Sequence, residues 1–195
     1  MQPPLVTLAD IRTGLTLRGA DASRRTDKGG LQLLRISDLT EDGRIAIENT
    51  HLIDRALADD PRYCVSPNDL LIANRGTRMT AALVPDGLAA IASGQLFIVR
   101  PHSDLVTPEY LHWFLNLPST QDHLRSHARG SYVKTLSIAV LKDLAVPVLP
   151  IELQRKVCEL AALAGRERDL LARITEQRQL LVQGTFQNVL KEFTT

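Results

Sequence analysis

The stretch GSYVKTLSIAVLKDLAVPVLPIELQRKV, residues 130–157, decides the fold, because it joins the end of a compact domain to the start of a long helix. Its first half predicts a short helix near Ile138 to Lys142 and a short strand around Leu144 to Val146. Pro147 and Pro150 then end the strand, since proline has no backbone N–H to donate. The proline pair therefore predicts a domain boundary.

Downstream of Pro150 the sequence predicts one long amphipathic helix that continues to about Lys191. No proline interrupts this stretch, and its apolar residues recur at steps of three and four, the spacing of one helix face. The apolar positions are Leu153, Val157, Leu160, Ala164, Leu171, Ile174 and Leu181, with Glu167 and Arg178 as polar interruptions. Gly165 and Gly184 lower helix propensity and leave a kink or a break open.

This helix is longer than the domain that precedes it. About forty residues at 1.5 Å rise each span roughly 60 Å, which exceeds the diameter of a domain of this size. Much of the apolar stripe cannot be covered by the chain's own strands. We therefore expect the helix to pair with another helix as a coiled coil.

Upstream of residue 130, short apolar runs alternate with turn residues. The runs are LQLLRI from Leu31, RIAI from Arg44, DLLIA from Asp69 and QLFIVR from Gln95. Short runs bounded by Gly, Pro, Asn and Asp are typical of strands. We expect four strands here, ahead of any helix.

Two helices follow the strands. Thr107, Pro108 and Glu109 supply a capping side chain, a proline for the first helical position and an acid for the helix dipole. A second helix is predicted from Ser119, which has capping-box spacing to Asp122. The fold class is therefore α+β: a compact mixed domain rich in short strands over residues 1–149, followed by a long C-terminal helix over 150–195.

Composition limits the classes of protein to consider. The 195 residues are 44% hydrophobic, enough for a buried core, and 23 basic against 22 acidic side chains leave a net charge of +1. Any nucleic-acid surface must therefore be a local patch of positive charge. Cys64 and Cys158 have no zinc-like spacing, and neither a signal peptide nor a membrane span is predicted, so we expect a cytoplasmic protein.

Asn74, Arg75 and Arg78 directly follow the apolar run DLLIA and flank Gly76, with no acid between Leu70 and Val84. Arginine can form a fork of hydrogen bonds to guanine, and asparagine to adenine, in the DNA major groove. A solvated turn, in which Asn and Gly serve the backbone conformation, is the alternative.

Two further basic stretches are candidates for phosphate contacts. Arg125, Arg129 and Lys134 lie in an acid-free segment, although Arg125 and Arg129 also fit the polar face of a helix. Arg24, Arg25 and Lys28 lie in a Gly- and Ser-containing loop that could order on DNA or be an ordinary surface loop.

Nothing in the sequence indicates catalysis. Nucleophile elbows, Gly-rich phosphate loops and HExxH motifs are absent. The acids Asp38, Glu41, Asp42, Asp59 and Asp60 are interpreted as solvated turns, and Tyr110, Trp113 and Phe114 as core residues of a helix.

The chain resembles the specificity subunits of type I restriction-modification systems over nearly its whole length. VTLADIRTGLTL resembles their first strand and turn glycine, here Gly14, and LLRISDLTEDGRI and SPNDLLIANRG resemble later strand-and-turn segments. The most specific match is residues 130–157, with a Gly-Ser, a short helix, an apolar strand, a proline pair and then a glutamine. Two features depart from the family: the chain holds one copy of a unit that full-length subunits hold twice, and its prolines are not adjacent.

The resemblance implies a non-catalytic subunit that recognises one half of a split DNA target and docks methyltransferase and possibly restriction subunits. It implies a homodimer paired through the long helix. S-adenosylmethionine, ATP and Mg2+ are then expected only in the partner subunits, and none in this chain. A stand-alone DNA-binding regulator with the same domain, and a small hydrolase or transferase with an unrecognised site, are the alternatives.

Overall fold

The computed structural model describes residues 2–17, 30–47, 51–54, 60–102 and 104–193. The chain divides into two compact units, Met1–Arg155 and Lys156–Thr195. The described residues form seven strands in two sheets, three short helices and one long C-terminal helix. This architecture confirms the predicted α+β class.

The larger sheet has four strands in the order β1-β7-β4-β5, and every neighbouring pair is antiparallel. Its strands are β1 (Ala9–Thr13), β7 (Leu96–Pro101), β4 (Leu70–Ala73) and β5 (Ala81–Leu83). All four residues of β4 are buried, so both faces of the sheet are covered at this strand. Leu71 packs in one hydrophobic cluster with Leu96 and Ile98, and alternation places Leu70 and Ile72 on the opposite face.

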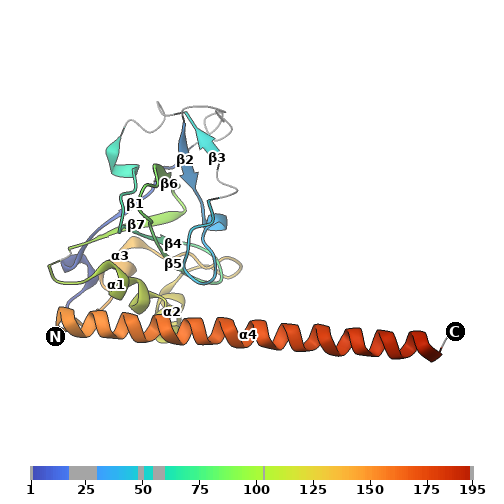
Figure 1. Cartoon of the computed structure of the whole chain (residues 1–195). Coiled ribbons are helices and arrows are strands. Elements are labelled where there is room, and N and C mark those ends of the chain that lie inside the picture. Colours follow the sequence, from blue (N-terminus) through green and yellow to red (C-terminus); the bar gives the residue numbers. More distant parts are fainter. Residues whose placement is uncertain (1, 18–29, 48–50, 55–59, 103, 194–195) are drawn as a thin grey trace. The chain divides into compact units, whose positions relative to one another are not determined.

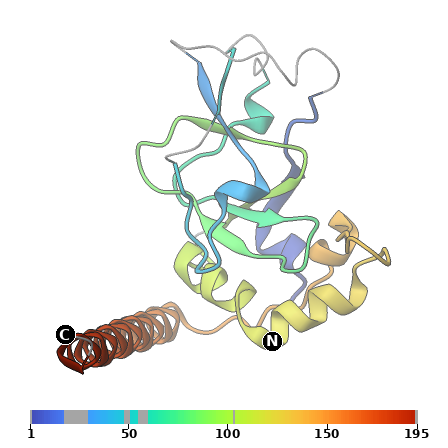
Figure 2. The ribbon, with the colours of Figure 1, turned by 90° about the vertical axis from the view of Figure 1, so that its right-hand side faces the viewer.

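The smaller sheet has the order β3-β2-β6 and is mixed. It contains β3 (His51–Ile53), β2 (Leu31–Leu34) and β6 (Ala90–Ala92), with β2 antiparallel to β3 and parallel to β6. Leu34 and Ala92 pack in the same cluster as residues of the larger sheet. In Figures 1 and 2 the smaller sheet lies on one side of the larger sheet, and helices α1, α2 and α3 lie on the other.

The short helices begin where local capping allows. In α1 (Pro108–Leu115) the Thr107 hydroxyl accepts a hydrogen bond from the Tyr110 N–H, which confirms the predicted start. The predicted helix at Ile138–Lys142 is confirmed as α3, capped by Ser137. The capping box predicted for the second helix is wrong: α2 (Pro118–His127) begins one residue earlier, without a side-chain cap. Proline at the first helical position fixes the required backbone angle instead.

Two predicted strands are reduced to single bridges. Ile45, within the run RIAI, pairs only with Leu39 across a tight turn. Ala145 pairs only with Pro4, between hydrogen bonds from the Leu5 N–H to the Leu144 carbonyl (2.8 Å) and from the Val146 N–H to the Pro3 carbonyl (2.9 Å). Proline cannot donate to a ladder, so the prolines of this segment stop the pairing from extending.

The turn that contains Gly43 is fixed against α1. The Nε2–H of His112 donates to the Gly43 carbonyl at 3.0 Å, and burial lowers the pKa of His112 below its ordinary value. Gly43 has a φ of +76°, and a Cβ there would lie 2.5 Å from Nε2 of His112. Glycine is therefore required both by the backbone angle and by the close packing.

Buried polar side chains hold other turns. Asp69 is 1% exposed and accepts hydrogen bonds from the Arg100 guanidinium at 2.7 Å, and this pairing raises the pKa of Arg100. The interpretation of Asp38 as a solvated turn residue is wrong. Asp38 is buried and accepts from the Arg35 N–H at 2.8 Å, which caps a turn of 3-10 helix after β2.

The long helix α4 extends from Ile151 to Phe193 without a break, through Gly165 and Gly184. Its first turn belongs to the first unit because Gln154 is fully buried there. The Gln154 amide accepts from the Thr107 N–H (2.8 Å) and donates to the carbonyls of Leu105 (3.1 Å) and Leu149 (2.7 Å). The sequence-based boundary after residue 149 thus precedes the helix, whereas the first compact unit ends at Arg155.

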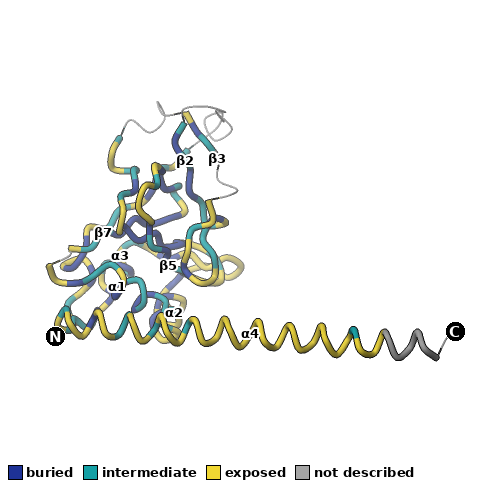
Figure 3. Tube along the Cα trace, in the orientation of Figure 1, coloured by how far each residue is buried: buried dark blue, intermediate teal, exposed yellow. Residues whose placement is uncertain are grey.

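In the second unit, most residues of α4 are exposed (Figure 3). The exposed side chains include Leu160, Leu171, Ile174 and Leu181, all members of the predicted apolar stripe. Among the described residues, no helix combines the length and the apolar character that a membrane crossing requires.

Candidate nucleic-acid interface

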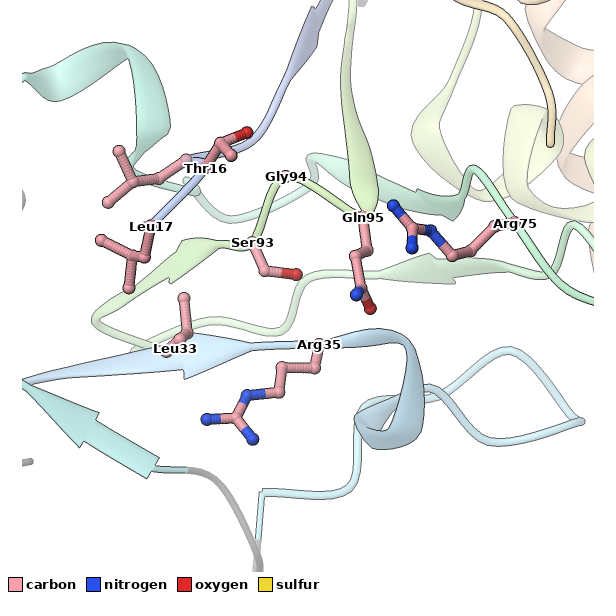
Figure 4. Close-up of a pocket in the computed structure, with 9 residues that line it drawn as sticks. Thr16, Leu17, Leu33, Arg35, Arg75, Ser93, Gly94 and Gln95 are labelled. Carbon is pink, nitrogen blue, oxygen red and sulfur yellow. The ribbon is translucent and has the colours of Figure 1, made fainter. Parts of the chain in front are cut away.

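Four segments that are distant in sequence meet around one pocket of about 410 Å³ in the first unit (Figure 4). They are the residues after β1, after β2 and after β4, and the turn between β6 and β7. The apolar part of the lining is Leu15, Leu17 and Leu33. The polar part is Thr16, Arg35, Arg75, Ser93 and Gln95, with Gly94 between the last two. The pocket therefore offers two guanidinium groups and one amide to a ligand.

Two glycines allow the β6–β7 turn to approach the end of β1. The Gly94 N–H donates to the Leu15 carbonyl at 2.6 Å, and the Leu15 N–H donates to the Ala92 carbonyl at 2.7 Å. A Cβ on Gly14 would lie 2.3 Å from the Ser93 carbonyl oxygen, and one on Gly94 would lie 2.4 Å from Oγ1 of Thr16. The turn glycine suggested by the family resemblance is thus a site of close backbone approach.

Arg75 lies beside the loop that follows α2. The Gly76 N–H donates to the Lys134 carbonyl at 3.0 Å, and the Leu136 N–H donates to the Asn74 carbonyl at 2.7 Å. Arg129 is held in the same loop by two backbone hydrogen bonds to Thr135, of 2.9 and 2.7 Å. The structure therefore brings together Arg75, Arg129 and Lys134, which the sequence placed in two separate basic clusters.

These three basic side chains are exposed, and Arg35 is half-buried. Within the described part of the chain, no ion pair is formed by Arg75, Arg129 or Lys134. A local positive surface therefore exists despite the near-neutral net charge. We call Arg35, Arg75, Arg129 and Lys134 the basic cluster.

Asn74 does not share this exposure. It is 7% exposed, and its amide nitrogen donates to the Gly94 carbonyl at 2.9 Å. This bond ties the end of β4 to the β6–β7 turn, which is a structural role. A contact from Asn74 to a base stays a prediction, and it would require the amide to leave this carbonyl.

Two other predicted DNA-binding residues have acidic partners. Arg78 pairs with Glu41 at 3.1 Å, an acid that the sequence places far from it, and Arg125 pairs with Asp122 on the same helix. All four side chains are substantially exposed, so these pairs are weak and can be exchanged for a phosphate. Arg24, Arg25 and Lys28 lie outside the described residues.

Sequence reasoning missed three residues of this region. Arg35 follows the strand LQLL just as Arg75 closely follows LLIA, and this shared position at a strand end was an available signal. Gln95 gave no signal, because a turn glutamine is ordinary. Tyr132 is fully exposed at 102%, in the loop between Arg129 and Lys134. A tyrosine hydroxyl next to basic residues can hydrogen-bond to DNA phosphates.

The aromatic residues of α1 are part of the core, as predicted, with one exception. Tyr110 and Phe114 are buried, and the Tyr110 hydroxyl donates to the Pro147 carbonyl at 2.7 Å. Trp113 is only half-buried, and the centroid of its ring lies 5.5 Å from the centroid of the Tyr110 ring. In the described ranges, no group of three or more His, Cys, Asp or Glu side chains is placed to hold a metal ion.

Comparisons with known proteins connect this domain to one class of protein. No family model matches the chain. A curated relative, the type I restriction enzyme EcoBI specificity subunit of Escherichia coli, is 26% identical over 172 residues, which cover 84% of this chain and 36% of that protein. The chain thus spans little more than a third of the length of that relative.

Solved structures show the same fold at low sequence identity. A chain of a type I R-M system has a TM-score of 0.68 at 18% identity and covers 89% of this chain and 40% of its own length. The HsdS subunit of Thermoanaerobacter tengcongensis has a TM-score of 0.60 at 16% identity, and the match covers 89% of this chain and 39% of that subunit. The type I S subunit of M. genitalium has a TM-score of 0.60 at 12% identity, and the match covers 88% of this chain and 40% of that subunit. In sequence and in fold, the chain is therefore similar to the specificity subunits of type I restriction-modification systems, as the sequence motifs predicted.

Proposed function

We propose that this chain is a DNA sequence-recognition subunit of a type I restriction-modification system or a related methyltransferase complex. The basic cluster at the strand-end pocket carries the proposal, because it lies on a domain similar to specificity subunits. Arg35 and Arg75 line the pocket, and Arg129 and Lys134 lie in the loop that is hydrogen-bonded to the backbone beside Arg75. On a chain with a net charge of +1, these four cations form a local surface suited to DNA. The chain binds one half of a split target.

The residues of the site divide into two roles. Arg75 and Arg35 each present a guanidinium that can form two hydrogen bonds to the O6 and N7 atoms of guanine, and Gln95 can do the same at adenine. Arg129 and Lys134 contact phosphates, which set position rather than sequence. Arg78 and Arg125 add phosphate contacts, and so do Arg24, Arg25 and Lys28, which lie outside the described residues.

We assign partner binding to the second unit. The helix α4 pairs with a second copy of the chain, so that a homodimer reads two halves of a symmetric split site. It also docks a methyltransferase subunit and, in a complete system, a restriction subunit. The chemistry that needs S-adenosylmethionine, ATP and Mg2+ belongs to those subunits, and this chain is not an enzyme.

The testing experiment co-expresses the full chain with the modification subunit of its own genome and sequences the methylated DNA. A split motif that is methylated only when this chain is present is the expected result. Binding to DNA without any methylation by a partner would instead favour the stand-alone regulator. A chain that binds neither a duplex of random sequence nor genomic fragments overturns the proposal.

Two variants then separate the roles, measured by fluorescence anisotropy on a duplex carrying the motif. Arg75→Ala is expected to lose preference at one base, by about tenfold. Arg129→Ala is expected to weaken binding to all duplexes and to reduce the salt dependence by about one phosphate contact. Arg44→Ala is the matched control, since Arg44 is an exposed arginine that pairs with Asp42 and is not among the residues that line the pocket.

A further inference from the structure

The strand-end pocket has an apolar wall beside its arginines and its glutamine. This wall consists of Leu15, Leu17 and Leu33, which we call the leucine wall. Leu33 is 5% exposed and belongs to a hydrophobic cluster of the smaller sheet, and Leu15 and Leu17 are half-buried and pack against that cluster. The core therefore holds the leucine wall in place, while part of it remains open to the pocket.

The leucine wall and the polar groups occupy different parts of the pocket. In the view of Figure 4, Leu17 and Leu33 lie on the left, whereas Gln95 and Arg75 lie on the right. Arg35 follows Leu33 by two residues on an extended backbone, with a φ of −124° and a ψ of 172°. Two residues of extended chain advance by about 6.6 Å, which is close to two base-pair steps of about 3.4 Å each. The pocket can therefore offer chemically different groups to neighbouring base pairs.

The lining residues restrict which bases the pocket can read. Among the described residues of the lining, none is acidic. Cytosine presents an N4 donor in the major groove, which Asp or Glu accepts, so cytosine has no matching side chain here. The arginines suit guanine and the glutamine suits adenine. Thymine alone carries an apolar group on its major-groove edge, the 5-methyl, and apolar side chains read it by contact.

Half-buried leucines at the rim of a core are common on protein surfaces and by themselves need no ligand. The leucine wall differs from such a rim because it converges with two guanidinium groups on one cavity of about 410 Å³. A cavity of that size admits a small organic group such as the edge of a base. Phosphates and the hydrogen-bonding edges of guanine and adenine would leave the leucines without a use, whereas a thymine methyl group matches them.

We propose that the leucine wall recognises the 5-methyl group of a thymine that lies within two base pairs of a guanine in the half-site. Arg35 or Arg75 forms the fork of hydrogen bonds to the guanine, and Leu15 and Leu17 pack against the methyl group. This inference rests on the proposed function and adds one base and the group by which it is read. Uracil lacks only this methyl group, so binding becomes sensitive to a change that preserves base pairing and charge.

The first test needs no knowledge of the target sequence. Genomic fragments are amplified once with thymidine triphosphate and once with deoxyuridine triphosphate. Both pools are then given to the full chain in complex with the modification subunit of its own genome. At limiting complex, the uracil pool is expected to be methylated about fourfold more slowly for each half-site read, the factor that corresponds to burial of one methyl-sized group. Equal rates on the two pools would overturn the inference.

The second test assigns the effect to the leucine wall. Synthetic duplexes carry the methylated motif with thymine, or with deoxyuridine at one thymine at a time, and fluorescence anisotropy measures their affinity for the full chain. At one position, the parent is expected to bind uracil about fourfold more weakly than thymine. Leu15→Ala and Leu17→Ala are expected to bind the two duplexes within about twofold of each other, because they lack the atoms that contact the methyl group.

Leu105→Ala is the matched control. Leu105 is a 48% exposed leucine of the first unit that is not among the residues lining the pocket, so its variant should keep the full discrimination against uracil. The leucines of the wall also pack against the core, and their variants are less stable than the parent. Each comparison uses two duplexes with the same protein, so an unfolded fraction lowers both affinities equally and leaves their ratio unchanged.

The outcomes separate this inference from the function on which it rests. A half-site with no thymine within two base pairs of a guanine would refute the methyl contact while leaving DNA recognition in place. The same conclusion follows if uracil replaces thymine at every position without loss, or if both leucine variants discriminate as strongly as the parent. A chain that binds neither pool of genomic fragments would refute the DNA-recognition function as well.

Discussion

Replacing Gln154 with alanine should destabilise the first unit far more than an ordinary helix substitution. The Gln154 side chain is fully buried and makes three hydrogen bonds, one to the N–H that precedes α1 and two to carbonyls in the connecting segments. Alanine can make none of them. The substitution therefore leaves the Thr107 N–H and the carbonyls of Leu105 and Leu149 without this partner.

The expected magnitude follows from the number of abandoned groups. A buried donor without an acceptor costs about 1–3 kcal/mol, and a carbonyl somewhat less because one lone pair is enough for partial satisfaction. With the packing lost by truncation, the free energy of unfolding should fall by about 3 kcal/mol. For a unit of about 150 residues this corresponds to a decrease of roughly 6–12 °C in the melting temperature.

The assay is urea unfolding followed by tryptophan fluorescence. Trp113 is the chain's single tryptophan and lies in α1, so its emission reports the first unit and not the rest of α4. Gln179→Ala is the matched control, because Gln179 is exposed on the same helix and shares the small gain in helix propensity. Equal midpoints for the two variants would refute the structural role assigned to Gln154.

Three further outcomes are expected. Because burial lowers the pKa of His112, the unfolded state takes up a proton at a higher pH than the folded state does. The free energy of unfolding should therefore be highest above about pH 6.5, the ordinary pKa of histidine, and should decrease as the pH falls below that value. His112→Gln should flatten this dependence in unfolding experiments between about pH 7.5 and 5. An unchanged slope would contradict the assignment. Gly14→Ala should lower the free energy of unfolding by about 2 kcal/mol through the clash with Ser93, whereas a parent-like urea midpoint would show that the turn relaxes freely. Tyr132→Ala should leave the free energy of unfolding within about 0.5 kcal/mol of the parent and, through loss of a phosphate contact, reduce affinity for duplex DNA several-fold in anisotropy. Unaltered affinity would remove Tyr132 from the interface.

Sequence reasoning succeeded where a structure is specified by near neighbours. Thr107 caps the helix that it was predicted to start, the short helix predicted at Ile138 to Lys142 is present, and the regular spacing of apolar residues predicted α4. The failures also have local causes. A proline start replaced the capping box expected at Ser119, and Asp38 was buried by its own turn rather than exposed.

The candidate site could be predicted only in pieces. Arg75 was identified because it follows an apolar strand, and Arg129 and Lys134 because their segment lacks acids. Their proximity was not predictable, since it depends on backbone hydrogen bonds between residues 74–76 and 134–136, about sixty positions apart. The ion pair between Arg78 and Glu41 is a similar case. The segment around Arg78 contains no acid, and its charge alone could not show that folding places an acid from another segment beside it.

The sequence by itself determined the α+β class, the proline-marked end of the domain, the long helix and the resemblance to specificity subunits. The class, the end of the domain and the long helix depend on capping, proline and periodicity signals between near neighbours, which act without knowledge of the fold, and the resemblance depends on the order of motifs along the chain. Only the tertiary structure decided that Asn74 ties the end of β4 to the β6–β7 turn while Arg35 and Gln95 line the pocket. The physical reason is that strand pairing selects which chain ends meet, and that selection is made by the packing of both sheets at once.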